Sequence, residues 1–315
     1  MERTIISLFC GVGGIDHPFY TSNFNVKFAN DFNEDAVKIY QQNFKHHVTY
    51  GDITKIPLNK IPKTTGVLAG FPCQAFSIAG HRLGFKDTRG TLFFNVLEVI
   101  NTKKPDFFLL ENVPGLVSHD NGNTFKVIIN SLQEIGYHVK YNVLSASEYG
   151  NIPQCRRRIY IVGFKNKAHC NNFTFPEKIK LTNSIENVID FNAKVDNKYY
   201  YTAEKYPKAY NLLKDAKLKD KTVYQIRRHY IRENKSGVCP TLTANMGTGG
   251  HNVPIIKTKY GIRKLTPAEC FMLQGFPKNF NIAGISNASA YTRAGNSVCV
   301  KVIERIKEEI VKAMV

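Results

Sequence analysis

The sequence predicts an α/β protein with a mostly parallel sheet covered by helices, followed by a smaller, irregular, β-rich region. Over the first half of the chain, short apolar runs alternate with segments of helical periodicity, which is typical of parallel strands joined by helices. After residue 164 the chain becomes rich in Lys, Asn and Tyr, with frequent turn signals. Its 315 residues suffice for one large domain and one small domain.

The expected elements follow one another in a regular order along the chain. Strands are expected at 4–9, 26–29, 66–69, 106–110 and 159–164, and helices at 35–41, 91–100, 124–134 and 297–315. We expect the last helix, which is amphipathic, to pack on the first domain. The sequence therefore predicts one domain made of residues 1–176 and 285–315 and a second made of residues 177–284.

Positive charge is concentrated in the middle of the chain. The formal net charge is +18, and residues 151–262 alone hold 21 Lys and Arg against 8 Asp and Glu. A segment of this kind is typical of contact with a polyanion, so we expect nucleic acid to bind there. Composition leaves one alternative open, a lysine-rich surface that is merely solvated.

Three features of the sequence indicate the cellular compartment, namely cysteine spacing, hydropathy and the first residues of the chain. The seven cysteines are scattered, with no CxxC or Cys/His pair at metal-ligand spacing, so we expect reduced thiols and no metal site. No apolar run approaches the roughly 20 residues that span a bilayer, and the first residues lack a signal-peptide pattern. We therefore expect a cytoplasmic protein without membrane contact.

A glycine-rich turn follows the first expected strand. Residues 9–14 read FCGVGG, and such glycines let the backbone turn sharply and approach a ligand. The next strand ends near Asp31, which is placed to accept hydrogen bonds from ribose hydroxyls, and Asp52 follows a third short run at the same sheet edge. The pattern indicates a nucleoside-containing cofactor, although tight packing without a ligand would also explain the glycines.

Three further motifs lie at the ends of expected strands. Cys73, in GFPCQ, follows the strand 66–69, and Glu111 ends an apolar strand where partial desolvation would favour the protonated carboxyl. In QCRRR, alternation along a strand would place Arg156 and Arg158 on one face, where two guanidinium groups suit a phosphate or a carbonyl oxygen. Each motif alone also fits a structural cysteine, a salt bridge or a surface strand.

Together these motifs resemble a known family. The ordered set FCGVGG, GDIT, GFPCQAFS, ENVPG, QCRRR, RKLTPAECFMLQGFP and AGNSV is similar to the bacterial DNA cytosine-5 methyltransferases of restriction–modification systems. The resemblance implies a Rossmann-like S-adenosylmethionine-dependent methyltransferase domain and a target-recognition domain. It further implies transfer of a methyl group to carbon 5 of a cytosine flipped out of a specific duplex DNA sequence. We expect a monomer, with a separately acting restriction endonuclease as a candidate partner.

The resemblance also implies roles for individual residues. Cys73 matches the nucleophile that adds to carbon 6, and Glu111 matches the acid that hydrogen-bonds and protonates ring nitrogen 3. Arg158 would hold the cytosine carbonyl oxygen, and Arg156 would help to position the site. The positions that match S-adenosylmethionine contacts are Phe9, Gly11, Gly13, Asp31, Phe32, Asp52, Ile53, Pro72, Leu92, Asn296 and Val298.

Contacts with DNA are expected near the nucleophile and in the basic region. The candidates are Gln74, Ser77, Gln225, Arg227, Arg228, Arg232 and Thr241, the last as a phosphate contact. Residues 75–92 have the length and glycine content of a loop that closes over an extruded base.

Three other functions stay open at this point. A flavin or nicotinamide oxidoreductase would use the glycine turn but would leave PCQ, ENV and the arginines unexplained. A tRNA cytosine methyltransferase would use the same chemistry, although the long basic insertion favours duplex DNA. A non-enzymatic DNA-binding module would explain the charge and would not need the thiol.

Overall fold

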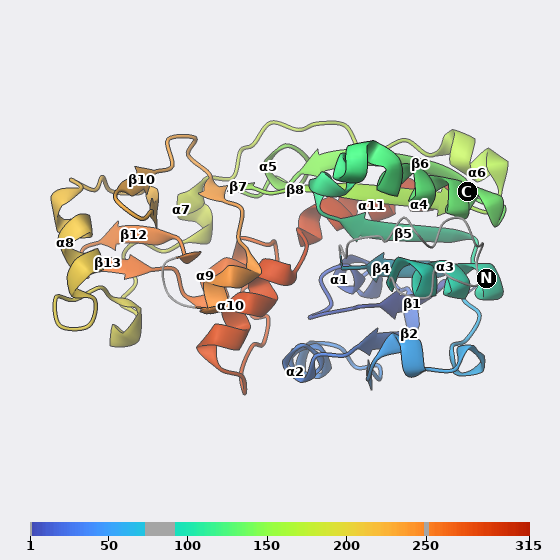
Figure 1. Ribbon diagram of the computed structural model, residues 1–315, viewed down its shortest axis with the longest axis horizontal. Coiled ribbons are helices and arrows are strands. Elements are labelled where there is room, and N and C mark those ends of the chain that lie inside the picture. The colour runs from blue at the N-terminus through green and yellow to red at the C-terminus, as the bar shows by residue number, and fades with distance from the viewer. Residues whose placement is uncertain (1, 73–91, 249–251) are drawn as a thin grey trace. The chain divides into compact units, whose positions relative to one another are not determined.

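The computed structural model describes residues 2–72, 92–248 and 252–315 (Figure 1). Its contacts divide the chain into two compact units. Unit 1 comprises Met1–Leu144, Arg157–Glu177 and Val302–Val315, and unit 2 comprises Ser145–Arg156 and Lys178–Lys301. This division by contacts differs from the predicted functional division over 145–156 and 285–301.

Unit 1 is built on one seven-stranded sheet. In chain order its strands are β1 (Thr4–Leu8), β2 (Asn25–Asp31), β3 (Thr49–Tyr50), β4 (Gly66–Gly70), β5 (Phe107–Asn112), β6 (His138–Ser145) and β8 (Arg157–Phe164). The spatial order is β3-β2-β1-β4-β5-β8-β6. The pairs from β3 through β5 are parallel, and β8 runs antiparallel to β5. The sheet is thus mostly parallel, as the sequence predicts.

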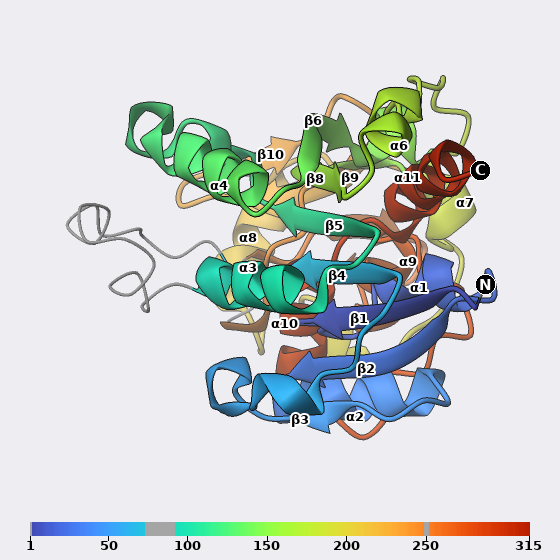
Figure 2. The same ribbon diagram turned by 90° about the vertical axis from the view of Figure 1, so that its right-hand side faces the viewer.

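Helices cover both faces of this sheet (Figure 2). They are α1 (Asp16–Tyr20), α2 (Glu34–Asn43), α3 (Leu92–Lys103), α4 (Asn123–Glu134), α6 (Lys167–Asn172) and α11 (Val300–Ala313). One face packs against α3 and α4 in a core that includes Ile6 and Phe108. On the other face, Phe19 of α1 stacks on Phe107 with ring centroids 6.1 Å apart. Lys307 of α11 donates to the Ser22 hydroxyl at 2.6 Å, so the last helix packs on this unit.

Two glycines make room for the aromatic residues of β5. Gly66 pairs with Phe107 across β4–β5, and Gly163 pairs with Phe108 across β5–β8. A Cβ at either glycine would lie within 2.3 Å of a ring carbon of its partner. The central strand therefore carries two large rings on opposite faces because its neighbours have no side chain at those points.

Unit 2 holds a smaller antiparallel sheet of order β10-β9-β12-β13. Its strands are β9 (Val223–Ile226), β10 (Ile231–Glu233), β12 (Ile255–Thr258) and β13 (Gly261–Lys264), and β7 (Gln154–Cys155) pairs separately with β11 (Cys239–Pro240). The helices are α5 (Ala146–Tyr149), α7 (Ile185–Val188), α8 (Pro207–Asp215), α9 (Pro267–Met272) and α10 (Asn287–Asn296). Helix α8 was not expected, because its only buried residues are Ala209 and Leu213, too few to give a clear period.

Short 3₁₀ helices complete the structure. These are η1 (Ile53–Lys55), η2 (Leu58–Lys60), η4 (Pro114–Val117), η5 (His119–Gly122), η6 (Asn197–Tyr199) and η7 (Ala244–Thr248).

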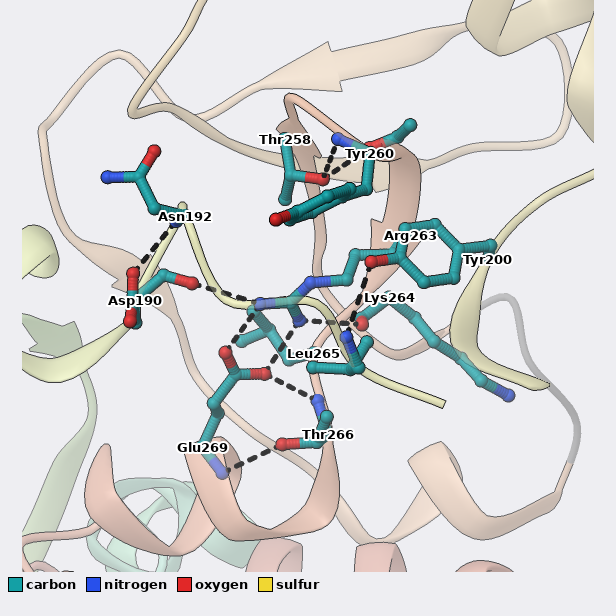
Figure 3. Close-up of polar contacts among 12 residues, drawn as sticks. Asp190, Asn192, Tyr200, Thr258, Tyr260, Arg263, Lys264, Leu265, Thr266 and Glu269 are labelled. Atoms are coloured by element: carbon teal, nitrogen blue, oxygen red, sulfur yellow. Dashed lines mark hydrogen bonds and ion pairs between the residues drawn. The ribbon is translucent and has the colours of Figure 1, made fainter. Parts of the chain in front are cut away.

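A buried ion pair joins β13 to α9 (Figure 3). The two terminal nitrogens of Arg263 donate to the two carboxylate oxygens of Glu269 at 2.7 and 2.8 Å, and the Arg263 side chain is fully buried. Glu269 also accepts from the backbone N–H of Thr266, whose hydroxyl accepts from Glu269 N. One side chain therefore closes the capping box of α9 and neutralises the arginine. Arg263 further donates to the carbonyl of Asp190.

We predict that Glu269→Gln destabilises the protein strongly. The substitution leaves the Arg263 charge buried without its counterion, and breaking a buried pair in this way costs about 3–5 kcal/mol. Glu34→Gln is the matched control, because the Glu34–Lys38 pair is exposed and should contribute little. Urea denaturation measures both changes, and hydrogen exchange should place the loss in unit 2. Equal midpoints for the two variants would contradict the prediction.

Candidate cofactor and catalytic site

The strand order of unit 1 places the predicted motifs at one edge of its sheet. The order reverses at the adjacent strands β1 and β4, from which the chain continues outward to β2 on one side and β5 on the other. In open α/β sheets, ligands bind outside the carboxyl ends of strands at such a switch point. The glycine turn follows β1, the GFPCQ segment follows β4, and Glu111 lies at the end of β5.

The glycine turn is held by its own backbone geometry. Phe9, Gly11 and Gly13 all have positive φ angles, of 53°, 55° and 84°. A Cβ at Gly13 would lie 2.2 Å from a ring carbon of Phe44, so the turn packs directly on α2 and its C-terminal cap. Glycine is required at this position for both conformation and space.

Asp31 ties the glycine turn to β2. Its carboxylate accepts from the backbone N–H of Gly11 and from that of Asn33, both at 2.8 Å. The next residue, Phe32, is 65% exposed, which is unusual for a phenylalanine. An acid beside an exposed aromatic ring, both at the edge of the glycine turn, suits the ribose and the base of a nucleoside.

The adjacent strand brings a second acid to this edge. Asn30 is buried and donates to the carbonyls of Thr49 and Gly51, both at 2.9 Å, which fixes the end of β3 beside β2. Asp52 follows and caps η1. Hydrogen bonds from the backbone and hydroxyl of Thr54 hold the pKa of Asp52 below its usual value. The Ile53 side chain is packed in the apolar core, and its expected contact with the cofactor stays a prediction.

A chain of hydrogen-bonded polar side chains lies beside the glycine turn. Asp16 is fully buried and accepts from the Ser7 hydroxyl at 2.6 Å and from the Tyr40 hydroxyl at 2.5 Å. The Tyr40 oxygen lies 2.6 Å from Nε2 of His46. Burial raises the pKa of Asp16 to about 6 and lowers the pKa of His46 to about 4. The sequence does not predict this network, because its members are spread over forty residues and form no recognisable motif.

Glu111 and Arg158 form an ion pair at the end of β5. Arg158 Nε lies 3.0 Å from Glu111 Oε1, and their side chains are only 14% and 11% exposed. Glu111 pairs with Gly70 of β4 on its other side, and a Cβ at Gly70 would lie 3.6 Å from the second carboxylate oxygen. The sequence predicts partial desolvation of Glu111, and the structure adds a cation that pairs with its carboxyl group. The predicted acid and one predicted arginine are thus brought together.

Asn112 extends this constellation toward the predicted nucleophile. Its amide donates to the carbonyl of Phe71 at 2.9 Å in a buried hydrogen bond. This bond fixes the chain as it leaves β4, two residues before Cys73. Asn112 lies in the motif ENV, but the motif alone predicts no role for it; the signal was its place directly after the acid in an otherwise apolar strand.

Several predicted residues lie outside the described part of the chain. Cys73, Gln74 and Ser77 are among these, as is most of the 75–92 segment that was expected to close over a base. Pro72 is exposed and is the last described residue before them, and Leu92 begins α3 and packs against the core.

Arg156 is held within unit 2. Its side chain is buried, and it donates to the carbonyls of Leu242 at 2.7 Å, Gly295 at 3.1 Å and Ser297. The expectation of one continuous strand through QCRRR is wrong, because β7 ends at residue 155 and β8 begins at residue 157. Arg156 therefore braces unit 2, whereas Arg158 binds Glu111 in unit 1.

Gln154 completes a buried polar network in unit 2. Its amide donates to the carbonyl of Leu273 and to Oε1 of Gln274, and it accepts from Leu242 N. Gln274 in turn donates to the carbonyl of Ala294 at 2.7 Å. The motifs QCRRR, PTLT, LQGFP and AGNSV thus meet in one network. Asn296, which is exposed, and Val298, which is buried, lie in the last of these motifs.

The predicted DNA contacts of unit 2 lie mainly on one hairpin. Arg227 and Arg228 are exposed in the turn between β9 and β10, Arg232 is exposed on β10, and Gln225 on β9 is half-buried. Thr241 differs, because its hydroxyl donates to the carbonyl of Cys155. A phosphate contact by Thr241 would therefore use a hydroxyl that already holds β7.

Comparison with known proteins identifies the family of the chain. Residues 3–312 match the family model described as C-5 cytosine-specific DNA methylase. The chain belongs to this family. The Type II methyltransferase M.Bsp6I of Bacillus sp. (strain RFL6) is 53% identical over 312 residues, which cover 98% of this chain and 99% of that protein. M.HaeII of Haemophilus aegyptius is 40% identical over 313 residues, covering 99% and 94%.

Solved structures show the same fold for the whole methylase. Spodoptera frugiperda DNMT2 superimposes with a TM-score of 0.75 at 22% identity, covering 98% of this chain and 100% of that chain. The Entamoeba histolytica methyltransferase EhMeth gives a TM-score of 0.73 at 22% identity, covering 100% and 99%. The predicted DNA cytosine-5 methyltransferase class is confirmed by the family, which excludes the oxidoreductase alternative and implies S-adenosylmethionine as methyl donor.

The described residues contain no group of three or more His, Cys, Asp and Glu side chains arranged to bind a metal ion. Nor does any helix within the described ranges have the length and apolar character needed to cross a membrane.

We predict that His46 makes the methylase less stable in acid. Its folded pKa of about 4 lies below the ordinary value of 6.5, so the unfolded chain binds a proton first as the pH falls. This contribution to stability is present above pH 6.5 and is lost as the pH falls toward 4. His46→Gln, which keeps a donor for Tyr40, should therefore flatten the loss of stability over this range.

Urea midpoints measured at several pH values test this prediction, with the exposed neighbour His47→Gln as the control. Asp16 is present in every variant, so its opposite pH dependence cancels in the comparison. An equal acid dependence for wild type and His46→Gln would show the prediction to be wrong.

Proposed function

We propose that this methylase transfers the methyl group of S-adenosylmethionine to carbon 5 of a flipped-out cytosine in a specific duplex DNA sequence. We propose further that Cys73 forms a covalent adduct with carbon 6. The observation that carries this proposal is the buried Glu111–Arg158 pair beside the strand that leads into Cys73. A cation and a carboxyl held together at a strand end suit the polar edge of a pyrimidine.

The edge of β1, β2 and β3 fits the cofactor. Asp31 would accept hydrogen bonds from the ribose hydroxyls, since a carboxylate offers about four lone-pair sites and accepts two backbone N–H groups here. The exposed ring of Phe32 would stack on the adenine, and Asp52 would accept from its amino group. Gly11 and Gly13 would allow close approach of the backbone, and Phe9, Ile53, Pro72 and Leu92 would line the site. When bound, S-adenosylmethionine supplies an electrophilic methyl group.

The chemistry requires a nucleophile because carbon 5 of cytosine is too weakly nucleophilic on its own. In the proposed reaction the Cys73 thiolate adds to carbon 6, which forms an S–C bond and moves the 5,6 electron pair toward carbon 5. Carbon 5 would then form a bond to the methyl group, while the bond between that methyl group and the donor sulfur breaks and leaves its electron pair on the sulfur. Loss of the proton from carbon 5 and cleavage of the S–C bond restore the double bond and release the thiolate.

Glu111 and Arg158 would hold the base during these steps. The carboxyl would hydrogen-bond ring nitrogen 3 and share a proton with it, which lowers the barrier to addition at carbon 6. The Arg158 guanidinium would donate to the carbonyl oxygen of the base. Asn112 would keep the segment before Cys73 in place through the Phe71 carbonyl.

Unit 2 would read the DNA sequence. A base stacked in a duplex cannot be attacked from above its ring, so the target cytosine would have to leave the helix. The basic middle region would supply phosphate and base contacts, through Gln225, Arg227, Arg228 and Arg232, with Gln74 and Ser77 close to the nucleophile. Asn296 and Val298 are proposed cofactor contacts, and Arg156 a positioning residue.

The likeness to Type II methyltransferases supports a proposal about the partners and compartment of the methylase. We propose that the methylase acts as a monomer in the cytoplasm, and that a separate endonuclease recognises the same site. The proposed substrate of the methylase is duplex DNA and not RNA, because the matched family is described as a DNA methylase.

Fluorinated DNA should trap the covalent adduct. A duplex synthesised with the 5-fluoro analogue of dCTP carries fluorine at each cytosine, so the recognised sequence need not be known. Fluorine at carbon 5 cannot leave as a proton does, and a complex that survives denaturing gel electrophoresis should form when S-adenosylmethionine is present. Cys73→Ser should form no such complex and should still bind DNA.

Cys155→Ser is the matched control, because Cys155 is an exposed free thiol and should be dispensable. Failure of the wild-type protein to form the complex, or an equal yield from Cys73→Ser, would rule out the proposed nucleophile.

Glu111→Gln should slow methylation about 100-fold or more, since loss of a general acid typically costs that much. The amide keeps the size of the side chain but cannot supply the proton. Arg157→Ala, which removes an exposed neighbour of Arg158, is the control and should retain most activity. Tritium transfer from labelled S-adenosylmethionine to DNA measures the rates, and a wild-type rate in Glu111→Gln would remove its proposed role.

A further inference from the structure

The β9–β10 hairpin of unit 2 has two chemically different faces. Ile226 pairs with Ile231 and Tyr224 with Glu233, and the three apolar members of these pairs pack on the core of the unit. Gln225 pairs with Arg232 on the opposite face, because neighbours along a strand point to opposite sides. We call the outer set Gln225, Arg227 and Arg232 the reading face.

One arginine of the reading face is hydrogen-bonded to a neighbouring side chain of the same face. Arg227 Nη2 donates to Oε1 of Gln225 at 3.1 Å, and its backbone N–H donates to the carbonyl of Tyr230 at 2.9 Å, which closes the turn. A flexible arginine loses rotamer freedom when it binds, so a neighbour that holds the guanidinium beforehand reduces that loss. The other guanidinium N–H groups keep their fork geometry for a ligand.

The residues around Arg227 favour a negatively charged partner that also presents hydrogen-bonding groups. Arg228 and His229 lie in the same turn, and Tyr230 beside them is 59% exposed. The one acid within the hairpin sequence 223–233, Glu233, is on the opposite face and pairs with Lys219 at 2.9 Å. The reading face therefore carries positive charge that no acid of the hairpin opposes.

We propose that Arg227 reads a guanine in the major groove of the target DNA, with Gln225 as the residue that positions it. A two-stranded ribbon fits the major groove, and two N–H groups of arginine match the O6 and N7 acceptors of guanine. A phosphate contact would not need a fixed guanidinium, because phosphate can be approached from many directions. Arg232 and Arg228 supply phosphate contacts. This proposal rests on the DNA methylation proposed above.

The test first determines the methylated sequence. Wild type and variants act on a pool of random duplexes, and bisulfite sequencing gives the sequence preference of each protein. Arg227→Ala should lose selectivity at one guanine and keep the rest of the motif. Arg228→Ala, which removes the same charge from the next residue, should lower methylation at every sequence alike. Gln225→Ala should weaken selectivity at the same guanine as Arg227→Ala.

Single-atom substitution in the DNA then identifies the contact. Replacing that guanine by 7-deazaguanine removes the N7 acceptor and keeps base pairing. The wild-type protein should lose on the order of 10- to 100-fold in methylation rate, as expected for a bidentate pair. Arg227→Ala should be insensitive to this replacement.

The possible results distinguish guanine recognition by Arg227 from the methylation of DNA itself. Methylation by wild type with an unchanged motif in Arg227→Ala would overturn guanine reading and leave the methylase function standing. Relaxation at a base other than guanine, or an equal 7-deazaguanine effect in both proteins, would also overturn it. Absence of any DNA methylation by wild type would overturn both proposals.

Discussion

The ion pair between Glu111 and Arg158 is the contact on which the site depends. It forms because β8 runs antiparallel to β5, which brings the start of one strand beside the end of the other. An all-parallel sheet would have placed these residues at opposite edges. Burial at this point disfavours a lone charge, and the pairing offsets that cost. The carboxyl and the guanidinium are consequently presented together to whatever enters beside β4.

Much of unit 1 could be predicted from the sequence. The strands β1, β2, β4 and β5 are short segments rich in apolar residues, and the helix α4 has a clear period, so the sequence predicts their positions to within a few residues. The strand β6 was missed because most of its residues are exposed or half-buried, which leaves no alternation to detect. The mostly parallel topology followed from the order of elements alone.

The site was predictable in its members and less so in its contacts. Motif spacing identified Glu111 and Arg158, but pairing between them depends on strand direction, which composition does not encode. The expected partnership of Arg156 with Arg158 failed at a break of one residue between β7 and β8. Likewise, the role of Asn112 depends on a carbonyl forty-one residues earlier in the chain. Such long-range hydrogen bonds have no local signature.

The same break has a bearing on how methylases of new specificity arise. Unit 2 takes its brace from Gln154 and Arg156, which precede strand β8 and are separated by residues 157–177 of unit 1 from the 178–301 segment that they support. If that segment alone were exchanged between relatives, Gln154 and Arg156 would have to donate hydrogen bonds to the backbone carbonyls of the incoming segment. Such an exchange would therefore require both parents to keep the same backbone around these two side chains. The exposed residues of the segment are not under this requirement.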